Sequence, residues 1–295
     1  INIFNPVYGS IPDSAYDEGS NGTGFRFFSS GLVKQTGLYV QDQVTLFDKL
    51  HLLLGGRYDY AEFGLGTSAL SREEAITDRH GRSVRKDSQF SPRAGILYEW
   101  TPRLSTYASY SKSFGANNGR SVTGETHPPE RGEQFEVGTK AELSQGLSAT
   151  VALFHLTKKN ILTPDLTTPD PTDTRAVGEA RSQGVEVDLL GTVMTQLNLI
   201  VTYAYLDTKV TRDDSGLQGN RLDNVPSHSG RVFLVYHFGG EDGLGWRVGG
   251  GVSAASAVSG DRENTFNLPA YYRLDAMTSY TAMVAGRRLN STCAI

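Results

Sequence analysis

Hydrophobic and polar side chains alternate along most of this chain with a period of two. That is the spacing of a β-strand with two unlike faces. The clearest case is 197–207, where one face carries Leu197, Leu199, Val201, Tyr203 and Tyr205 and the other is mostly polar. About eleven segments alternate well enough to predict strands, among them 50–60 and 104–114.

The connections between these strands alternate between short and long. Short turns are predicted at 47–49, 101–103, 144–146, 191–196 and 239–243, and long polar loops at roughly 64–89, 115–132, 160–180, 211–226 and 259–270. A barrel in the outer membrane has short periplasmic turns and long outward loops. The pattern therefore predicts an all-β fold, an antiparallel up-and-down transmembrane β-barrel of the bacterial outer membrane. A ligand would meet its long-loop rim.

Charged side chains are predicted to collect on the face turned away from lipid. They are Arg57, Asp59, Arg93, Glu99, Glu136, Lys140, Glu186, Asp188, Arg231 and Arg247. Burying so many charges in a dry core would cost several kcal/mol each, so water or a polar plug is expected on that side. Two residues depart from the pattern, because Asp42 and Lys112 fall on the apolar face. Lys112 is near the outer end and can extend its ammonium to water, whereas the pattern gives no reason for Asp42.

Composition narrows the class of protein. The chain is 38% hydrophobic and has no apolar run of about eighteen residues, which excludes a helical membrane bundle. The single Cys293 excludes a disulfide within the chain, and the net charge of -4 argues against a nucleic-acid partner. A soluble β-sandwich or a surface adhesin remains an alternative, with the apolar faces buried against a second sheet.

Sequence motifs of enzymes and metal sites are missing. The chain has no His-Glu-x-x-His, no Gly-x-Ser-x-Gly and no phosphate-binding loop. The acidic stretch 170–173 lacks the ligand spacing of a calcium loop, and His80, His127 and His228 are isolated. We therefore predict no catalytic residues, no metal site and no cofactor.

Several short sequence segments, in their order along the chain, resemble segments in the C-terminal half of the TonB-dependent outer-membrane siderophore receptors. They include Gly56-Arg57-Tyr58-Asp59, Phe90-Ser91-Pro92-Arg93-Ala94-Gly95, Gln134-Phe135-Glu136-Val137-Gly138, Ser182-Gln183-Gly184-Val185-Glu186-Val187 and Leu268-Pro269-Ala270-Tyr271. The resemblance implies a barrel of about twenty-two strands around a plug domain. It also implies uptake of a ferric siderophore, whose iron is substrate and not cofactor. The implied partners are outer-membrane lipid and an inner-membrane energy-transducing TonB complex, reached through a missing N-terminal segment. A passive porin is the alternative transporter.

Against that family the chain is expected to be incomplete. Residues 1–34 are assigned to an outward loop, 35–281 to a partial barrel without the plug domain, and 282–295 to a truncated or aberrant tail. Unpaired sheet edges are expected near 35–47 and 270–281, because a barrel satisfies its backbone groups only on closure.

Candidate ligand-binding residues lie at strand ends on the long-loop side. The aromatic and imidazole candidates are Tyr60, Phe63, Phe114 and His127, and Arg120 and Arg131 are available for an anionic chelate. Stacking surfaces and a few polar groups suit a concave site for such a ligand. The alternative for each aromatic is a place in the membrane-interface girdle.

Overall fold

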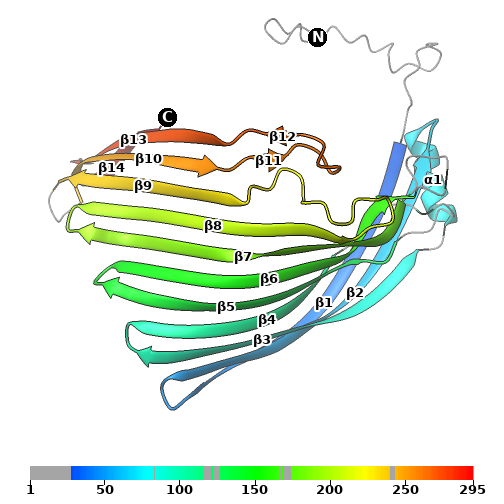
Figure 1. Cartoon of the computed structure of the whole chain (residues 1–295), viewed down its shortest axis with the longest axis horizontal. Coiled ribbons are helices and arrows are strands. Elements are labelled where there is room, and N and C mark those ends of the chain that lie inside the picture. The colour runs from blue at the N-terminus through cyan, green and yellow to red at the C-terminus, as the bar shows by residue number, and fades with distance from the viewer. Residues whose placement is uncertain are drawn as a thin grey trace, which may run out of the picture.

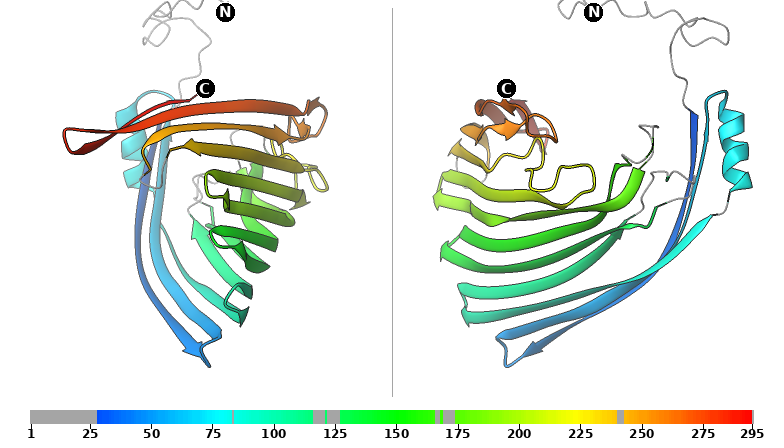
Figure 2. Two further views of the ribbon diagram at one scale, coloured as in Figure 1. Left: turned by 90° about the vertical axis from the view of Figure 1, so that its left-hand side faces the viewer. Right: turned by 45° about the vertical axis from the view of Figure 1, so that its right-hand side comes forward.

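The computed structural model describes residues 28–82, 84–115, 121, 127–165, 168, 174–239 and 243–294. Twelve strands of this part form one antiparallel sheet in which each strand lies beside the next in sequence (Figure 1). They are β1 (Phe28–Leu46), β2 (Leu50–Ser68), β3 (Arg85–Thr101), β4 (Leu104–Gly115), β5 (Glu130–Ser144), β6 (Leu147–Pro164), β7 (Thr174–Met194), β8 (Leu197–Arg212), β9 (His228–Phe238), β10 (Gly245–Ala255), β13 (Tyr271–Val284) and β14 (Arg287–Ala294). The predicted antiparallel up-and-down arrangement is confirmed, in a sheet that curves without closing (Figure 2).

The sheet is a single layer. Within the described part, each of its strands contacts only its neighbours in the sheet, apart from α1 (Arg72–Gly81), which packs on β1 and β2. Large apolar side chains are consequently left open, including Leu54, Val137, Leu153, Val232 and Leu234. The sandwich alternative requires a second sheet over these residues, and the described residues provide none.

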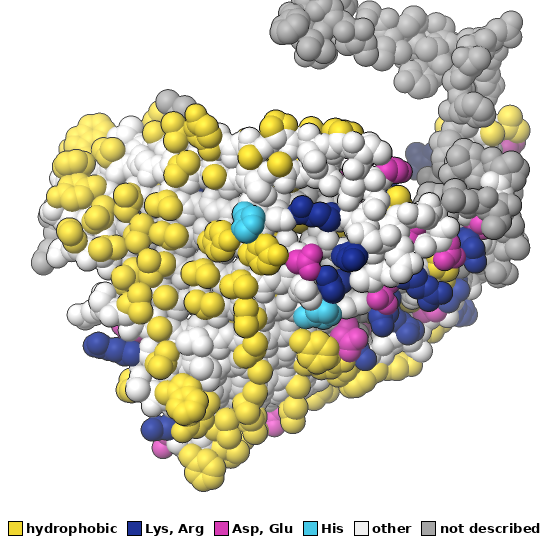
Figure 3. Space-filling view, viewed as in Figure 1, with side chains coloured by type: hydrophobic (Ala, Val, Ile, Leu, Met, Phe, Trp, Pro, Cys, Tyr) yellow, Lys and Arg dark blue, Asp and Glu magenta, His cyan; other side chains and the backbone are white. Residues whose placement is uncertain are grey.

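The pairing register assigns each side chain to one of two faces. Val187 pairs with Tyr203, and Val201 with Val232, so these four side chains lie on what we call the apolar face. The opposite face, here the polar face, carries all ten charged residues that the alternation segregates, from Arg57 on β2 to Arg247 on β10. Figure 3 shows hydrophobic side chains spread over the viewed face of the sheet and charged ones gathered toward the outer ends of its strands.

Tight turns join the strands at one end of the sheet. In the β1–β2 turn Phe47 and Asp48 have φ of 53° and 58°, and at the β13–β14 turn Ala285 and Gly286 have φ of 51° and 75°. The long connections lie at the other end, as the sequence predicts. The β2–β3 connection is shorter than the predicted loop 64–89, because both strands extend into it and it contains α1.

Helix α1 is absent from the sequence prediction, although a local signal for it exists. Ser71 caps the helix by accepting a hydrogen bond from the backbone N–H of Glu74 at 3.1 Å, and acidic residues occupy the first turn. Ser-x-x-Glu is the spacing of a capping box. The fully buried Ala75 packs at Gly66 of β2, where a Cβ would lie 2.2 Å from the Ala75 carbonyl oxygen. No helix in the described ranges is both long enough and apolar enough to cross a membrane.

Three predicted boundaries need correction. β1 begins at Phe28, so the division at residue 34 falls inside a strand, and residues 1–27 lie outside the described part. The segment assigned to a tail continues the sheet instead, because β13 runs to Val284 and Leu289 of β14 pairs with Ala282. β14 therefore forms the second edge, which the sequence places at 270–281. The small hairpin of β11 (Val258–Ser259) and β12 (Asn267–Leu268) is also missed.

Candidate ligand-binding surface on the polar face

A hollow of about 660 Å³ opens on the polar face over β1 to β4. Its lining includes Gln35, Tyr39, Arg57, Asp59, Arg93 and Phe114. Gln35 and Tyr39 are absent from the sequence-predicted site, although they alternate with the apolar Leu38 and Val40 in β1. The hollow combines aromatic rings, amide groups and two guanidinium groups, which is a set suited to a polar, anionic ligand.

The Asp59 carboxylate organises the floor of this hollow. Only 3% of Asp59 is exposed. Its two oxygens accept hydrogen bonds from Arg57 Nε at 2.8 and 2.9 Å, and Oδ1 also accepts one from Gln35 Nε2 at 3.0 Å. Arg57 and Asp59 can meet because residues two apart in a strand share a face.

The guanidinium groups of Arg57 and Arg93 give the hollow positive charge. The Arg57 guanidinium fits over Gly37, the register partner of Asp59, because a Cβ at Gly37 would lie 2.2 Å from Arg57 Nη2. Arg93 makes no ion pair with any described residue and is exposed. Because only Asp59 opposes these two arginines, the surface attracts anions.

An aromatic pair borders the same region. The ring centroids of Phe63 and Phe114 are 6.5 Å apart with an interplanar angle of 45°, and only 2% of Phe63 is exposed. Alternation alone groups Phe114 with the apolar side chains of β4. In the structure the pairing of β3 with β4 stops at Ser111, and beyond it the Phe114 ring reaches Phe63.

The other sequence-predicted ligand residues are dispersed. His127 is buried, with its Nε2 2.9 Å from Thr174 Oγ1. Tyr60 lies on the apolar face, where its hydroxyl donates a hydrogen bond to Glu62 Oε1 at 3.2 Å. Arg131 pairs in register with Lys159 on that same face. Arg120 lies outside the described residues. The structure thus brings Phe63 and Phe114 together and places Arg131 opposite Phe114 in the pairing of β4 with β5, whereas Tyr60 lies on the other face of β2 from Phe63.

The polar face over β7 to β10 is acidic, in contrast to the cationic hollow over β1 to β4. A second hollow, of about 480 Å³, is lined by Glu186, Asp188, Thr202, Arg231 and Ser253. The Arg231 guanidinium stacks over the Phe233 ring at 4.9 Å and lies 3.7 Å from Asp275. Arg231 is therefore directed toward β13, and the two carboxylates make this part of the face acidic.

Two neighbouring outward connections are bonded to each other. The Asn264 side chain exchanges hydrogen bonds of 2.8 and 3.0 Å with the backbone of Arg221, and Asn220 Nδ2 donates to the Arg262 carbonyl at 2.9 Å. Burial raises the pKa of Asp213, but hydrogen bonds from the Ser215 hydroxyl and nearby backbone N–H groups outweigh it, so this pKa lies below its usual value. These contacts fix one side of the rim.

The part of the chain that is described contains no group of three or more His, Cys, Asp or Glu side chains placed to hold a metal ion. A ligand in the hollow over β1 to β4 would meet aromatic rings, amide groups and guanidinium groups.

Comparison with known proteins gives a consistent set of relatives. The family described as "TonB dependent receptor-like, beta-barrel" matches residues 2–290. The chain is 36% identical over 287 residues to the metal-pseudopaline receptor CntO of Pseudomonas aeruginosa, an alignment that covers 95% of this chain and 38% of that protein. It is 33% identical over 282 residues to the ferrichrome outer membrane transporter/phage receptor of Escherichia coli, covering 95% and 36%.

A solved structure shows the same fold. The siderophore receptor PiuA from Acinetobacter baumannii matches with a TM-score of 0.70 and 26% identity, over 86% of this chain and 37% of that one. The chain thus spans 36–38% of the length of these three proteins.

Proposed function

Because this chain belongs to the TonB-dependent receptor-like β-barrel family, we propose that it forms part of the wall of a receptor for energy-coupled uptake of a ferric siderophore. The family match confirms the resemblance predicted from the sequence, and it places the chain in the bacterial outer membrane. The complete receptor would draw energy from an inner-membrane TonB complex.

The observation that carries the proposal is the division of a one-layer sheet into an apolar and a polar face. Leu54, Val137 and Leu153 are each at least half exposed, which fits contact with lipid, whereas the polar face holds the charged residues and the hollows. A receptor wall needs both properties at once. The cationic hollow with its aromatic border supports an anionic chelate as the ligand.

The proposal specifies a chemical class and not one compound. The names of relatives include metal-pseudopaline, ferrichrome and ferrioxamine B. Barrels of this family therefore accommodate several different chelates. Iron would arrive as an intact complex and needs no ligands from the protein.

Uptake by whole cells tests the function. A strain lacking the complete receptor gene is complemented with that gene and offered a panel of ⁵⁵Fe-labelled siderophores. We expect accumulation of one or a few of them, lost when the proton gradient is collapsed or TonB is deleted. Uptake of many small solutes that survives both treatments would instead identify a passive porin.

Binding of the labelled siderophore to cells that carry receptor variants, measured with the proton gradient collapsed, tests the binding surface. Phe114→Ala, Arg93→Ala and Arg120→Ala in the full-length receptor are each expected to weaken chelate binding about tenfold, the size of a moderate interface hot spot. Phe238→Ala is the matched control, because this exposed ring lies at the inner end of β9 on the apolar face. Unchanged binding in all three variants would remove these residues from the site.

A further inference from the structure

Asp42 places an exposed carboxylate in the middle of the apolar face of β1. Two apolar residues lie on each side of it along this face, namely Leu38, Val40, Val44 and Leu46. Tyr58, the first of the outer tyrosines of β2, is opposite the outermost of these four, and the turn to β2 begins directly after the innermost. The apolar band of an outer-membrane barrel is about 25 Å tall and ends at aromatic residues. Asp42 therefore lies near the middle of that band.

The side of β1 that is paired with β2 offers Asp42 no partner. Asp42 makes no hydrogen bond or ion pair with a described residue. Its register partner is Leu54, and the residues diagonal to it are Leu52 and Gly56, none of which has a side-chain donor. An isolated carboxylate in hydrocarbon is costly, and ionisable residues at this depth are as a rule paired. A partner for Asp42 can come only from the other side of β1, which is an edge of the described sheet.

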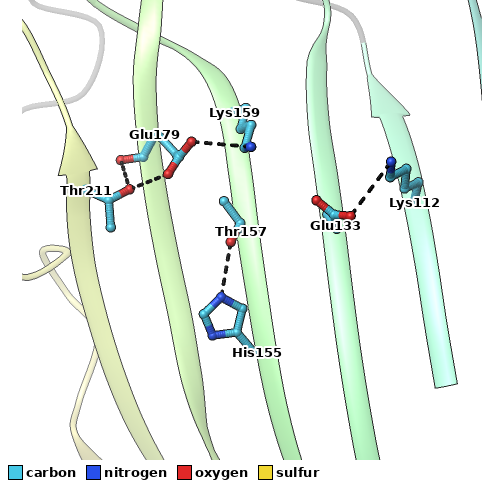
Figure 4. Close-up of polar contacts among 7 residues, drawn as sticks. All are labelled: Lys112, Glu133, His155, Thr157, Lys159, Glu179 and Thr211. Carbon is cyan, nitrogen blue, oxygen red and sulfur yellow. Dashed lines mark hydrogen bonds and ion pairs between the residues drawn. The ribbon is translucent and has the colours of Figure 1, made fainter. Parts of the chain in front are cut away.

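The other carboxylates on the apolar face indicate which kind of partner this is. Each carboxylate that the remaining described strands place on this face lies close to a cation: Glu62 to Lys86 at 3.8 Å, Glu133 to Lys112 at 3.7 Å, Glu179 to Lys159 at 3.7 Å and Asp207 to Arg181 at 2.7 Å. Figure 4 shows the second and third of these pairs. In the first three pairs the cation is the register partner on the neighbouring strand. Opposite charges in that position stabilise an antiparallel pair, and Asp42 alone has none.

We propose that the strand pairing with the free edge of β1 in the complete receptor carries an arginine or a lysine opposite Asp42, on the side that faces lipid. The two side chains form an ion pair in the middle of the membrane. A slip by one residue would turn the cation toward the lumen and leave Asp42 alone, so the pair also fixes the register of that strand. This inference rests on the position of the sheet in the outer membrane and not on the ligand that the receptor takes up.

The sequence and strand pairing of the complete receptor give the first test. We expect an arginine or a lysine in the strand next to β1, at the register partner of Asp42 or at one of the two positions diagonal to it. These three positions face lipid and lie within reach of the carboxylate. A neighbouring strand with no basic residue at any of the three would overturn the proposal.

Urea unfolding of the full-length receptor in lipid vesicles gives the second test. Asp42→Leu leaves the cation without a counter-charge, and we expect the unfolding equilibrium constant to rise about 30-fold, from the cost of a lone basic side chain at this depth. Asp42→Asn keeps an acceptor oxygen but loses the charge, and a rise of about tenfold is expected. Asp42→Glu keeps the carboxylate and should stay within about threefold of the parent.

Val44→Leu is the matched control. It changes the size of the next residue inward on the same face of β1 and leaves every charge in place. We expect its unfolding equilibrium constant to lie within about twofold of the parent. A loss as large as that of Asp42→Leu would show that packing of the edge strand, and not charge, determines both results, and this would overturn the proposal.

The sign of the Asp42→Leu effect separates the remaining alternatives. A carboxylate that has no partner costs stability in lipid, so leucine would then stabilise the receptor or leave it unchanged, and either result would overturn the proposal. A loss with Asp42→Leu but none with Asp42→Asn would show a neutral donor in place of a cation, which also contradicts it. If Asp42→Leu does not insert at all, the comparison of Asp42→Asn with Asp42→Glu decides. Because no transport is measured, these tests can fail while the proposed uptake function stands.

Discussion

Val201→Arg in the full-length receptor is expected to destabilise the membrane-inserted barrel by about 2–4 kcal/mol, the cost of an arginine at the bilayer midplane. Val201 lies on the apolar face between Leu189 and Val232, two positions below the first of the outer tyrosines of β8. A guanidinium at this depth reaches water only by extending its full length past Tyr203 or by thinning the bilayer, and both are costly. The measurement is the unfolding free energy from urea titration of the receptor in lipid vesicles.

The neighbouring substitution Thr202→Arg is the matched control. Thr202 lies on the polar face, between Asp188 and Arg231, and the new guanidinium would find an acidic, hydrated surface there. We expect a change below about 1 kcal/mol for this variant. If Val201→Arg were as mild as Thr202→Arg, the apolar face would not be in contact with lipid.

Asp59→Ala is expected to lower the unfolding free energy by about 2–3 kcal/mol, the range for hydrogen bonds to a charged group that leave a partner unsatisfied. Asp59 is nearly fully buried and accepts from both Arg57 and Gln35. The half-exposed Arg57 can turn to water, which keeps the loss below that of a fully buried ion pair. Guanidinium unfolding of the full-length receptor measures the change.

Asp188→Ala provides the comparison for Asp59→Ala. Asp188 lies on the same face and makes no ion pair with a described residue. Its removal should change the unfolding free energy by less than about 1 kcal/mol. Equal effects of the two substitutions would show that the Arg57–Asp59–Gln35 contacts contribute nothing specific.

The strands and their faces follow from the sequence because two-residue alternation is a local property. Leu199, Val201 and Tyr203 identify one face without any knowledge of the neighbouring strands. The charged residues on the opposite face follow from the same count. The alternating short and long connections then indicate which end of the sheet is the rim.

The features that the sequence does not predict depend on contacts between distant segments. Helix α1 is only ten residues long and is secured by Gly66 of β2, as well as by its own cap. The strand β14 has few apolar residues, and its pairing with β13 identifies it. The position of Phe114 depends on where β3 and β4 separate, which alternation within β4 cannot reveal.

Of the two charged residues that depart from the alternation, the structure explains one and not the other. Lys112 is explained by its neighbours, since its ammonium lies beside Glu133 and over the Tyr110 ring at the outer end of β4. Asp42 lies on the apolar face of the edge strand β1, opposite Leu54, and nothing in the structure explains it.

Labelling of single cysteines along β8 tests the central claim most directly. In a full-length receptor whose native cysteines, Cys293 among them, are replaced by serine, positions 199 to 204 are replaced one at a time by cysteine and exposed to a water-soluble and a lipid-soluble thiol reagent. If the apolar face contacts lipid and the polar face contacts a hydrated lumen, the lipid-soluble reagent labels cysteines at 199, 201 and 203. The water-soluble reagent labels cysteines at 200, 202 and 204 that are not covered by the plug domain. Protection of 199, 201 and 203 from both reagents would contradict the account, because protein and not lipid would then cover the apolar face.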